Sequence, residues 1–157
     1  MTPWPPDYDT RLSGESCALC AEGRPEETPN RVLFYSSDWC DGYLHKHGVQ
    51  CGFATVIWRG RHAVEPTHLT EHEATTFWLE ALHVGRAMEA HYRPLKMNYS
   101  LLGNGAPHLH WLIAPRFVDD VAPGGPLPTS EYVEFPEGEI RRDIAALRSL
   151  LTDGGSI

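Results

Sequence analysis

The sequence predicts an α+β domain built on an antiparallel sheet. Three observations support this fold class: strand-like segments lie before and after one long helical segment, that segment has clear start and stop signals, and a second amphipathic helix follows near the C-terminus. Strands grouped on both sides of a helix, rather than alternating with helices, favour an antiparallel sheet. A chain of 157 residues has room for a single domain with one sizeable core.

The N-terminal third contains a leader, a cysteine pair and three strands. Residues 1–16 predict an irregular leader, and residues 17–20 a compact turn beneath the first strand. A polar connection broken by prolines leads to two short strands, 31–36 and 42–47. Residues 52–61 are richer in β-branched and aromatic side chains and predict a central strand.

One long helix is predicted over residues 71–92. Thr70 is a suitable N-cap, and Glu73, three residues later, completes a capping box. Pro94 ends the helix, because proline cannot continue its hydrogen bonding. Apolar residues recur at helical spacing and form a stripe that packs on the sheet, namely Ala74, Phe77, Trp78, Ala81, Gly85 and Met88.

The C-terminal half adds two strands and a second helix. Residues 96–102 form a strand that should lie beside the apolar strand 108–114. Residues 118–130 are a surface segment rich in proline and glycine. A helix over residues 139–151 places Ile140, Ile144, Leu147 and Leu151 on one side. We therefore divide the chain into a leader (1–16), a sheet domain (17–130) and a C-terminal helical extension (131–157).

Two histidines at the start of the strand 108–114 carry the clearest sign of chemistry. Side chains alternate along a strand, so His108, His110 and Leu112 share one face, and the residues between them point into the core. Adjacent imidazoles suit metal ligation, nucleophilic attack or acid–base chemistry, although two histidines alone also fit a solvated face. The preceding turn, 103–107, is rich in glycine and allows backbone amides to face an anion.

Composition excludes several classes of partner. The net charge of −8 argues against binding nucleic-acid polymers by phosphate neutralisation, but it does not exclude a small phosphorylated ligand. No apolar run is long enough to span a bilayer, and the N-terminus lacks the basic-then-apolar order of a signal peptide. We therefore expect a cytoplasmic protein with no membrane partner.

The four cysteines fit metal ligands or buried thiols better than disulfides in an intracellular protein. Cys17 and Cys20 have the C-x-x-C spacing of metal ligands. The alternative is a redox pair, but no thioredoxin-like βαβ pattern surrounds them. Cys40 and Cys51 have no partner at such a spacing, so we expect both to be small core residues.

Taken in order, these segments resemble the histidine triad (HIT) family, specifically its zinc-containing bacterial branch. The shared order is the Cys17–Cys20 pair, Arg61-His62 at the end of a strand, a strand bearing Asn98, and a glycine turn followed by His108-x-His110. The resemblance covers residues 17–117. It implies a HIT-like antiparallel sheet with one long helix packed on it. Family members commonly form homodimers, which this sequence neither supports nor excludes.

The resemblance also implies a structural zinc ion bound by Cys17, Cys20, His62 and His108. Four thiolate and imidazole ligands suit tetrahedral zinc, which would tie the N-terminal segment to the histidine strand. His45 and His47 form a second H-x-H pair that we interpret as solvated, with a second metal site or extra active-site groups as alternatives. The histidines on or near the long helix should be exposed or half-buried; these are His68, His72, His83 and His91.

In the family, the middle histidine of the triad attacks phosphorus and forms a covalent nucleotidyl-histidine. The resemblance therefore implies that His110 is the nucleophile of a hydrolase or transferase acting on a nucleoside phosphate conjugate. Asn98 matches the asparagine that contacts substrate in relatives, and Arg116 lies where relatives often carry arginine. Asn104, with the amides near Gly105, would hold phosphoryl oxygens, although Asn104 fits a turn residue equally well.

One position departs from the family pattern. Relatives carry histidine or glutamine at the third triad position, and this chain carries Leu112, which cannot donate a hydrogen bond. Losing one such donor costs on the order of a hundredfold in rate. Candidate replacements are His45, His47, Lys96 and Arg116. Alternatives to the enzyme hypothesis are a nucleotide-binding protein without catalysis and an enzyme repurposed for specialised metabolism.

Overall fold

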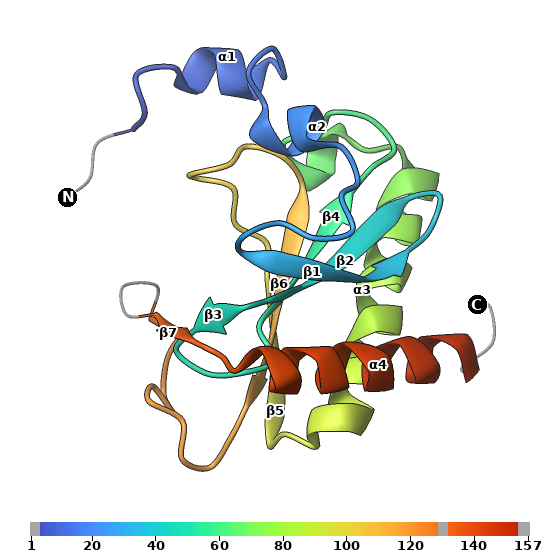
Figure 1. Cartoon of the computed structure of the whole chain (residues 1–157). Coiled ribbons are helices and arrows are strands. Elements are labelled where there is room, and N and C mark those ends of the chain that lie inside the picture. The colour runs from blue at the N-terminus through green and yellow to red at the C-terminus, as the bar shows by residue number, and fades with distance from the viewer. Residues whose placement is uncertain (1–3, 129–131, 154–157) are drawn as a thin grey trace.

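The computed structural model describes residues 4–128 and 132–153, and a five-stranded antiparallel sheet lies at its centre (Figure 1). The strands follow the order β1-β2-β4-β6-β5 across the sheet. This order places the histidine strand inside the sheet, with the predicted neighbour β5 beside it. The strands are β1 (Arg31–Ser36), β2 (Cys40–His45), β4 (Ala54–Trp58), β5 (Lys96–Ser100) and β6 (His110–Arg116).

The register of the sheet decides which side chains surround His110. On β4, Ile57 lies opposite His110 and Thr55 lies opposite Leu112. On β5, Ser100 lies opposite Leu112. Paired residues of antiparallel strands project from the same face, so these side chains share one face of the sheet, which we call the His110 face.

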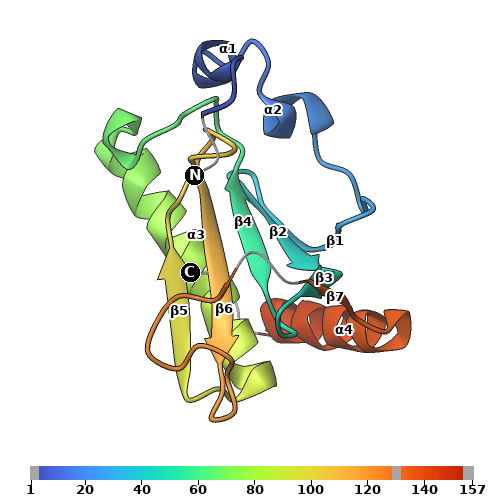
Figure 2. The ribbon, with the colours of Figure 1, turned by 90° about the vertical axis from the view of Figure 1, so that its left-hand side faces the viewer.

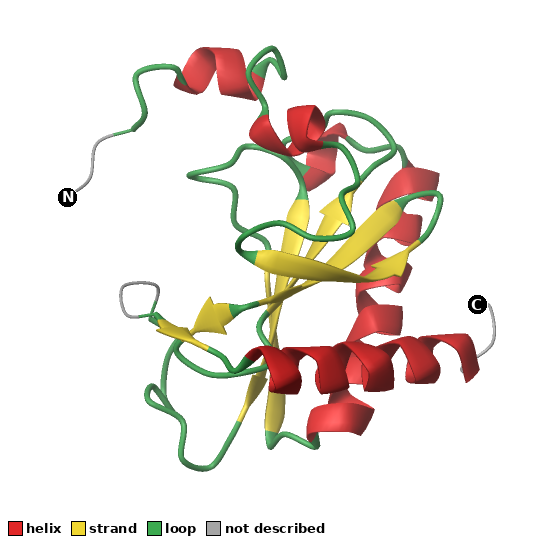
Figure 3. Cartoon of the chain, in the orientation of Figure 1, coloured by secondary structure: helices red, strands yellow, loops and turns green. Residues whose placement is uncertain are grey.

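Two helices, α3 (Glu71–Tyr92) and α4 (Glu137–Asp153), cover the opposite face (Figures 1 and 3). Both pack into the main core with the residues that alternate with the His110 face, among them Val56, Trp58 and Ile113. Ile140, Ile144 and Leu147 of α4 are buried as expected, and Leu151 is partly buried. The predicted α+β fold, with a long helix and a C-terminal helix on an antiparallel sheet, is confirmed.

Local signals explain the limits and the position of α3. The predicted capping box is present: the Glu73 amide donates to Thr70 Oγ1 at 3.3 Å, and the Thr70 amide donates to the Glu73 carboxylate at 2.8 Å. The helix ends at Arg93, which adopts the left-handed conformation with φ 48° immediately before Pro94. A Cβ at Gly85 would clash with the Tyr99 hydroxyl, so glycine lets α3 approach β5 closely.

The N-terminal segment lies at one end of the molecule, away from α4 (Figure 1). It contains α1 (Tyr8–Leu12) and α2 (Ala18–Glu22), and a short 3-10 helix, η1 (Pro66–His68), precedes α3. Cys17 and Leu19 form a second, smaller core with Leu33, Tyr43 and Ile57. The segment around Cys17 and Cys20 therefore packs on the His110 face beneath β1, as predicted.

A two-stranded ribbon continues beyond the main sheet. β3 (His47–Gly48) pairs with β7 (Val133–Glu134) just before α4. The proline- and glycine-rich segment after β6 forms a loop that passes in front of β5 and β6 (Figure 2). No helix or strand is assigned to it between residues 117 and 128, and the remainder of the predicted segment, 129–130, lies outside the described residues.

Several sequence predictions of local structure were wrong. The leader contains a short helix, and the predicted strand 42–47 divides into β2 and β3. The histidine strand begins at His110, so His108 lies just before it. Trp78 is 51% exposed rather than buried in the helix stripe, and its ring packs edge-on against Trp111. Cys40 is buried as predicted, but Cys51 is exposed in the turn that precedes β4.

No helix in the described part of the chain is both long enough and apolar enough to cross a membrane.

Candidate active site and metal centre

His110 opens β6 and is held in one tautomer by the backbone. Its Nδ1 lies 2.7 Å from the carbonyl oxygen of His108, and because a carbonyl can only accept, Nδ1 carries the proton. Burial lowers the pKa of His110, and the nearby Arg31 guanidinium lowers it further, while the bond to His108 acts in the opposite direction. The ring is therefore neutral near pH 7, with a lone pair on Nε2. This is the state that nucleophilic attack requires.

Hydroxyl groups lie around Leu112 on the His110 face. Leu112 is half-buried between Thr55 and Ser100, its neighbours on the two flanking strands. Thr55 is buried, and its hydroxyl lies 2.7 Å from Nε2 of His45. The Ser100 side chain is half-buried and has no hydrogen bond among the described residues. The surroundings of Leu112 are therefore polar but without an acidic group.

Arg116 and Asn98 are brought together at the other end of this face. Arg116 is 8% exposed, and its guanidinium donates to the Asn98 side-chain oxygen and to Asp120. It also donates to the carbonyls of Gly125 at 2.8 Å and Ala122 at 2.5 Å. Asp120 raises the pKa of Arg116, and Arg116 in turn holds the pKa of Asp120 low. Arg116 thus fixes Asn98 and the loop after β6, and its hydrogen-bonding groups are engaged within the protein.

Asn104 and Gly105 lie in the exposed turn before His108, against the N-terminal helix. Arg11 of α1 donates to the Gly105 carbonyl at 3.2 Å. Asn104 lines a cavity of about 190 Å³ together with Trp4 and Tyr8. The structure does not bring these two residues together with Asn98 and Arg116, which lie toward the other end of β6.

The predicted metal ligands converge from three segments. Cys17, Cys20, His62 and His108 each offer one ligand atom, and these atoms lie within 4.8 Å of one another. The His108 Nδ1 lies 3.4 Å from both sulfur atoms, and the His62 Nδ1 lies 3.5 Å from Cys20 Sγ. A tetrahedral zinc ion with Zn–S near 2.3 Å and Zn–N near 2.05 Å separates sulfur and nitrogen ligands by about 3.6 Å. The four residues therefore fit zinc in donor type and in spacing.

Backbone carbonyls orient both imidazoles of this cluster. The Nε2 of His108 lies 2.7 Å from the Trp58 carbonyl, and the Nε2 of His62 lies 2.9 Å from the Leu12 carbonyl. Both Nε2 atoms must donate, so both Nδ1 atoms present lone pairs to the centre of the cluster. Burial lowers the pKa of His108, which keeps the ring neutral.

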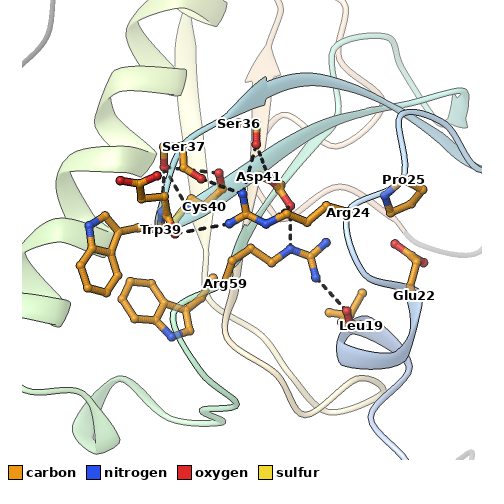
Figure 4. A network of polar contacts seen from close by, with 12 residues as sticks. Leu19, Glu22, Arg24, Pro25, Ser36, Ser37, Trp39, Cys40, Asp41 and Arg59 are labelled. Carbon is orange, nitrogen blue, oxygen red and sulfur yellow. Dashed lines mark hydrogen bonds and ion pairs between the residues drawn. The ribbon is translucent and has the colours of Figure 1, made fainter.

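A buried ion pair that the sequence analysis did not identify anchors the segment that carries Cys17 and Cys20 (Figure 4). Asp41 of β2 is fully buried and accepts from Arg59 Nε at 2.8 Å and from Ser36 at 2.7 Å. Arg59 also donates to the Leu19 carbonyl at 2.7 Å, and Arg24 lies 3.5 Å from the same carboxylate. The network ties the segment between Cys17 and Arg24 to the sheet, on the side that carries His110. No sequence motif around Asp41 indicates this network.

His45 and His47 were predicted as a solvated pair, but both are half-buried. They line a cavity of about 210 Å³ whose other walls include Arg31, Phe53 and Tyr132. The His45 ring meets the edge of Phe53, and the His47 ring meets the edge of Tyr132. Burial lowers the pKa of His45 to about 3, with Arg31, His47 and His110 contributing. The cavity is larger than a water site but smaller than typical whole-ligand pockets of about 300–1,000 Å³, so it suits one part of a ligand.

Comparison with protein families gives one match. The model of the HIT domain family matches residues 26–118, which is more than half of the chain. No curated protein matches the sequence.

Solved structures with the same fold include several histidine triad proteins. A histidine triad protein from Bradyrhizobium japonicum is 24% identical with a TM-score of 0.72, covering 78% of this chain and 91% of its own. A zinc-bound histidine triad family protein from Mycobacterium smegmatis is 20% identical with a TM-score of 0.64, covering 88% and 95%. A diadenosine triphosphate hydrolase from Plasmodium falciparum is 12% identical with a TM-score of 0.59, covering 96% and 99%.

Proposed function

The chain belongs to the HIT domain family, and on that basis we propose that it is a nucleotidyl hydrolase or transferase acting on a nucleoside phosphate conjugate through a covalent nucleotidyl-His110 intermediate. The observation that carries this proposal is the hydrogen bond from His110 Nδ1 to the His108 carbonyl. It leaves Nε2 unprotonated beside a polar face of the sheet. The structural neighbour from Plasmodium falciparum is a diadenosine triphosphate hydrolase, and this supports the same class of substrate.

The proposed reaction has two steps. The Nε2 lone pair of His110 attacks the phosphorus atom, the bond from phosphorus to the leaving group breaks, and the leaving group takes the electron pair. Water or another hydroxyl acceptor then attacks phosphorus and releases its proton to solvent, and the electron pair of the P–N bond returns to Nε2. The proton stays on Nδ1 and donates to the His108 carbonyl throughout, and this hydrogen bond stabilises the positive charge that develops on the ring.

The ligand we propose is a small nucleotide or phosphate ester, not a nucleic-acid polymer or a membrane. Asn98 would contact the substrate through its side-chain amide, with Arg116 fixing the orientation of that amide. Asn104 and the amides near Gly105 remain the proposed groups for phosphoryl oxygens at the entrance to β6. A homodimer remains a proposal from the family resemblance alone.

We propose in addition that Cys17, Cys20, His62 and His108 bind a structural zinc ion. The donor set and the 3.4–3.5 Å separations support zinc. When bound, the ion would supply cross-linking of the N-terminal segment to the start of β6. His108 is both a ligand and the residue whose carbonyl orients His110, so the metal centre would position the nucleophile.

The His110→Ala variant tests the proposed function. Removing the attacking nitrogen should lower the rate of nucleotide release by at least about a thousandfold. Release would be measured by chromatography with nucleoside phosphoramidates and dinucleoside polyphosphates. His72→Ala, an exposed histidine on α3, is the matched control and should retain the wild-type rate. Full activity in His110→Ala would refute the nucleophile assignment.

Leu112 favours a second candidate function, a protein that binds nucleotides without turning them over. Leucine at this position removes a donor that relatives place beside the phosphate. This candidate predicts measurable nucleotide affinity by calorimetry in both wild type and His110→Ala, with no product in either. The other alternative, an enzyme repurposed for other chemistry, predicts turnover that does not depend on His110.

A further inference from the structure

The His110 face offers hydrogen-bond donors around the nucleophile but no acid. Leu112 is the next side chain along this face of β6, and its cross-strand neighbours are Thr55 and Ser100. Aliphatic hydroxyls can donate a hydrogen bond to a phosphoryl oxygen, but they do not release a proton at neutral pH. The side chains nearest Leu112 can therefore stabilise charge without protonating a leaving group.

The cations on this face, which are Arg31, Arg59, Arg116 and Lys96, are also unable to act as acids at His110. Arg116 is bound to Asn98, Asp120 and two loop carbonyls, and a guanidinium does not lose its proton in proteins. Lys96 lies opposite Arg116 in the sheet, six positions along the strand from His110. At about 3.3 Å per residue, this separation is roughly 20 Å.

The two remaining imidazoles do not supply an acidic proton beside Leu112. His45 is held neutral at pH 7, because burial lowers its pKa to about 3, and its Nε2 is engaged by Thr55. His47 lies two residues farther along the chain, in β3, with its ring against Tyr132. The His47 ring lies 6.4 Å from the ring of His45, and His47 is four positions along the chain from Tyr43, whose row of the sheet contains Thr55 and Leu112.

The other ionisable groups of this face are also engaged. The Asp41 carboxylate is fully buried and accepts from Arg59 and Ser36. The Tyr43 hydroxyl donates to the Pro25 carbonyl at 3.0 Å, and burial raises its pKa. Among the described side chains that share a row of the sheet with Leu112, which are Tyr43, Thr55 and Ser100, none releases a proton at neutral pH.

Resting on the proposed function, we infer that this site cleaves nucleoside phosphoanhydrides, whose leaving group is a phosphate, and discriminates against phosphoramidates. When His110 Nε2 attacks the nucleotidyl phosphorus of an anhydride, the P–O bond breaks and the phosphate leaves with the electron pair as a stable anion. No proton is needed. When the leaving group is an amine, the P–N bond cannot break with the electron pair left on nitrogen unless that nitrogen is protonated.

The Leu112→His variant tests this inference. General acids contribute about 10²–10⁴-fold to such steps. In the wild type, diadenosine triphosphate should therefore react at least about a hundredfold faster than adenosine 5′-phosphoramidate, measured as His110 adduct formation in single-turnover reactions. Leu112→His places an imidazole beside His110 and should speed the phosphoramidate at least about tenfold, with little effect on the anhydride.

Leu112→Gln is the matched control, because glutamine is of similar size and donates a hydrogen bond but no proton at neutral pH. It should leave the preference for the anhydride unchanged, as should His47→Gln. Because the base of the substrate is not identified, the same comparison of anhydride and phosphoramidate would be repeated with guanosine, cytidine and uridine in place of adenosine.

The possible results distinguish failure of the leaving-group inference from failure of the proposed function. Equal adduct rates with both leaving groups in the wild type, or an unchanged ratio in a folded Leu112→His protein, would overturn the leaving-group inference while the nucleophile assignment stands. A lost preference in His47→Gln would assign the discrimination to His47 instead. No adduct with any anhydride would overturn the proposed function, and this inference with it.

Discussion

At the scale of single residues, hydrogen bonds to the backbone determine the state of the histidines. His110 and His108 each donate one ring N–H to a carbonyl, at 2.7 Å in both cases. Different nitrogens are used, so His110 presents Nε2 and His108 presents Nδ1. Two histidines two residues apart therefore have different capacities, one for attack on phosphorus and the other for metal ligation.

His45 makes the stability of the protein depend on pH. Its folded pKa of about 3 lies below its ordinary value of 6.5, so between these values the unfolded chain binds more protons. Stability from this group is therefore present above about pH 6.5 and is lost as the pH falls toward 3. Urea unfolding at pH 7.5 and pH 4.5 should show a smaller pH-dependent loss in His45→Gln than in the wild type. His68→Gln, at an exposed position, should behave as the wild type; an equal loss in His45→Gln would contradict this assignment.

The sequence could predict which residues carry chemistry better than it could predict their contacts. The four cysteine and histidine residues of the metal cluster were identified from spacing and family order, and the structure brings them together. The engagement of Arg116 by Asp120 and loop carbonyls, by contrast, was not predicted. Such contacts depend on how the loop after β6 folds back, which no local pattern encodes.

At the scale of elements, the cysteine segment is held to the sheet in two ways. Cys17 and Leu19 pack against Leu33, Tyr43 and Ile57, and Arg59 links Asp41 to the Leu19 carbonyl. A metal ion at the cluster would add a third attachment. The segment is thus positioned partly by contacts that do not require metal.

Replacing one ligand should separate the contribution of the metal from that of the packing. Cys17→Ser should reduce bound zinc and lower the melting temperature by roughly 5 °C or more, since each kcal/mol corresponds to about 2–4 °C at this size. Metal content would be measured by elemental analysis and melting by calorimetry. Cys51→Ser, at the exposed cysteine, should change neither. An unchanged zinc content in Cys17→Ser would remove Cys17 from the ligand set.

The Asp41–Arg59 pair should be a major contributor to stability. The two side chains are 0% and 7% exposed, and removing one partner of a buried pair typically costs about 3–5 kcal/mol because a buried charge is left uncompensated. Arg59→Met should show a loss of this size in urea unfolding. Arg141→Met, at an exposed arginine paired with Glu27 and Glu137, is the control and should change stability little. Equal losses of unfolding free energy in the two variants would contradict the larger contribution expected of the buried pair.

Elements with strong local signals were predicted well, and short ones were not. The helix α3 and the strand β1 have the predicted limits, because a capping box, a proline and a polar connection mark them. The short elements α1, α2 and β7 were missed. Segments of two to five residues form through tertiary contacts, such as the pairing of β7 with β3, and carry almost no periodicity.

At the scale of the whole molecule, the two faces of the sheet have different roles. Both long helices cover one face and form the main core, and the other face carries His110, Leu112 and Thr55. The ribbon of β3 and β7 extends from this sheet toward α4, and Tyr132 next to β7 lines the cavity of His45. The C-terminal part of the chain therefore contributes to the core, as the apolar side of the predicted helix indicates, and also to a cavity wall, which no motif in residues 131–157 indicates.

The most direct test of the central claim, that His110 is a nucleophile, is trapping of the covalent intermediate. Wild type and His110→Ala would be incubated with a series of nucleoside phosphoanhydrides, quenched within milliseconds to seconds, and analysed by intact-mass spectrometry with peptide mapping. We predict a mass increase of one nucleotidyl group in the wild type, located on His110, and none in the variant. An adduct on another residue, an adduct that persists in His110→Ala, or product formed without any adduct would contradict the account.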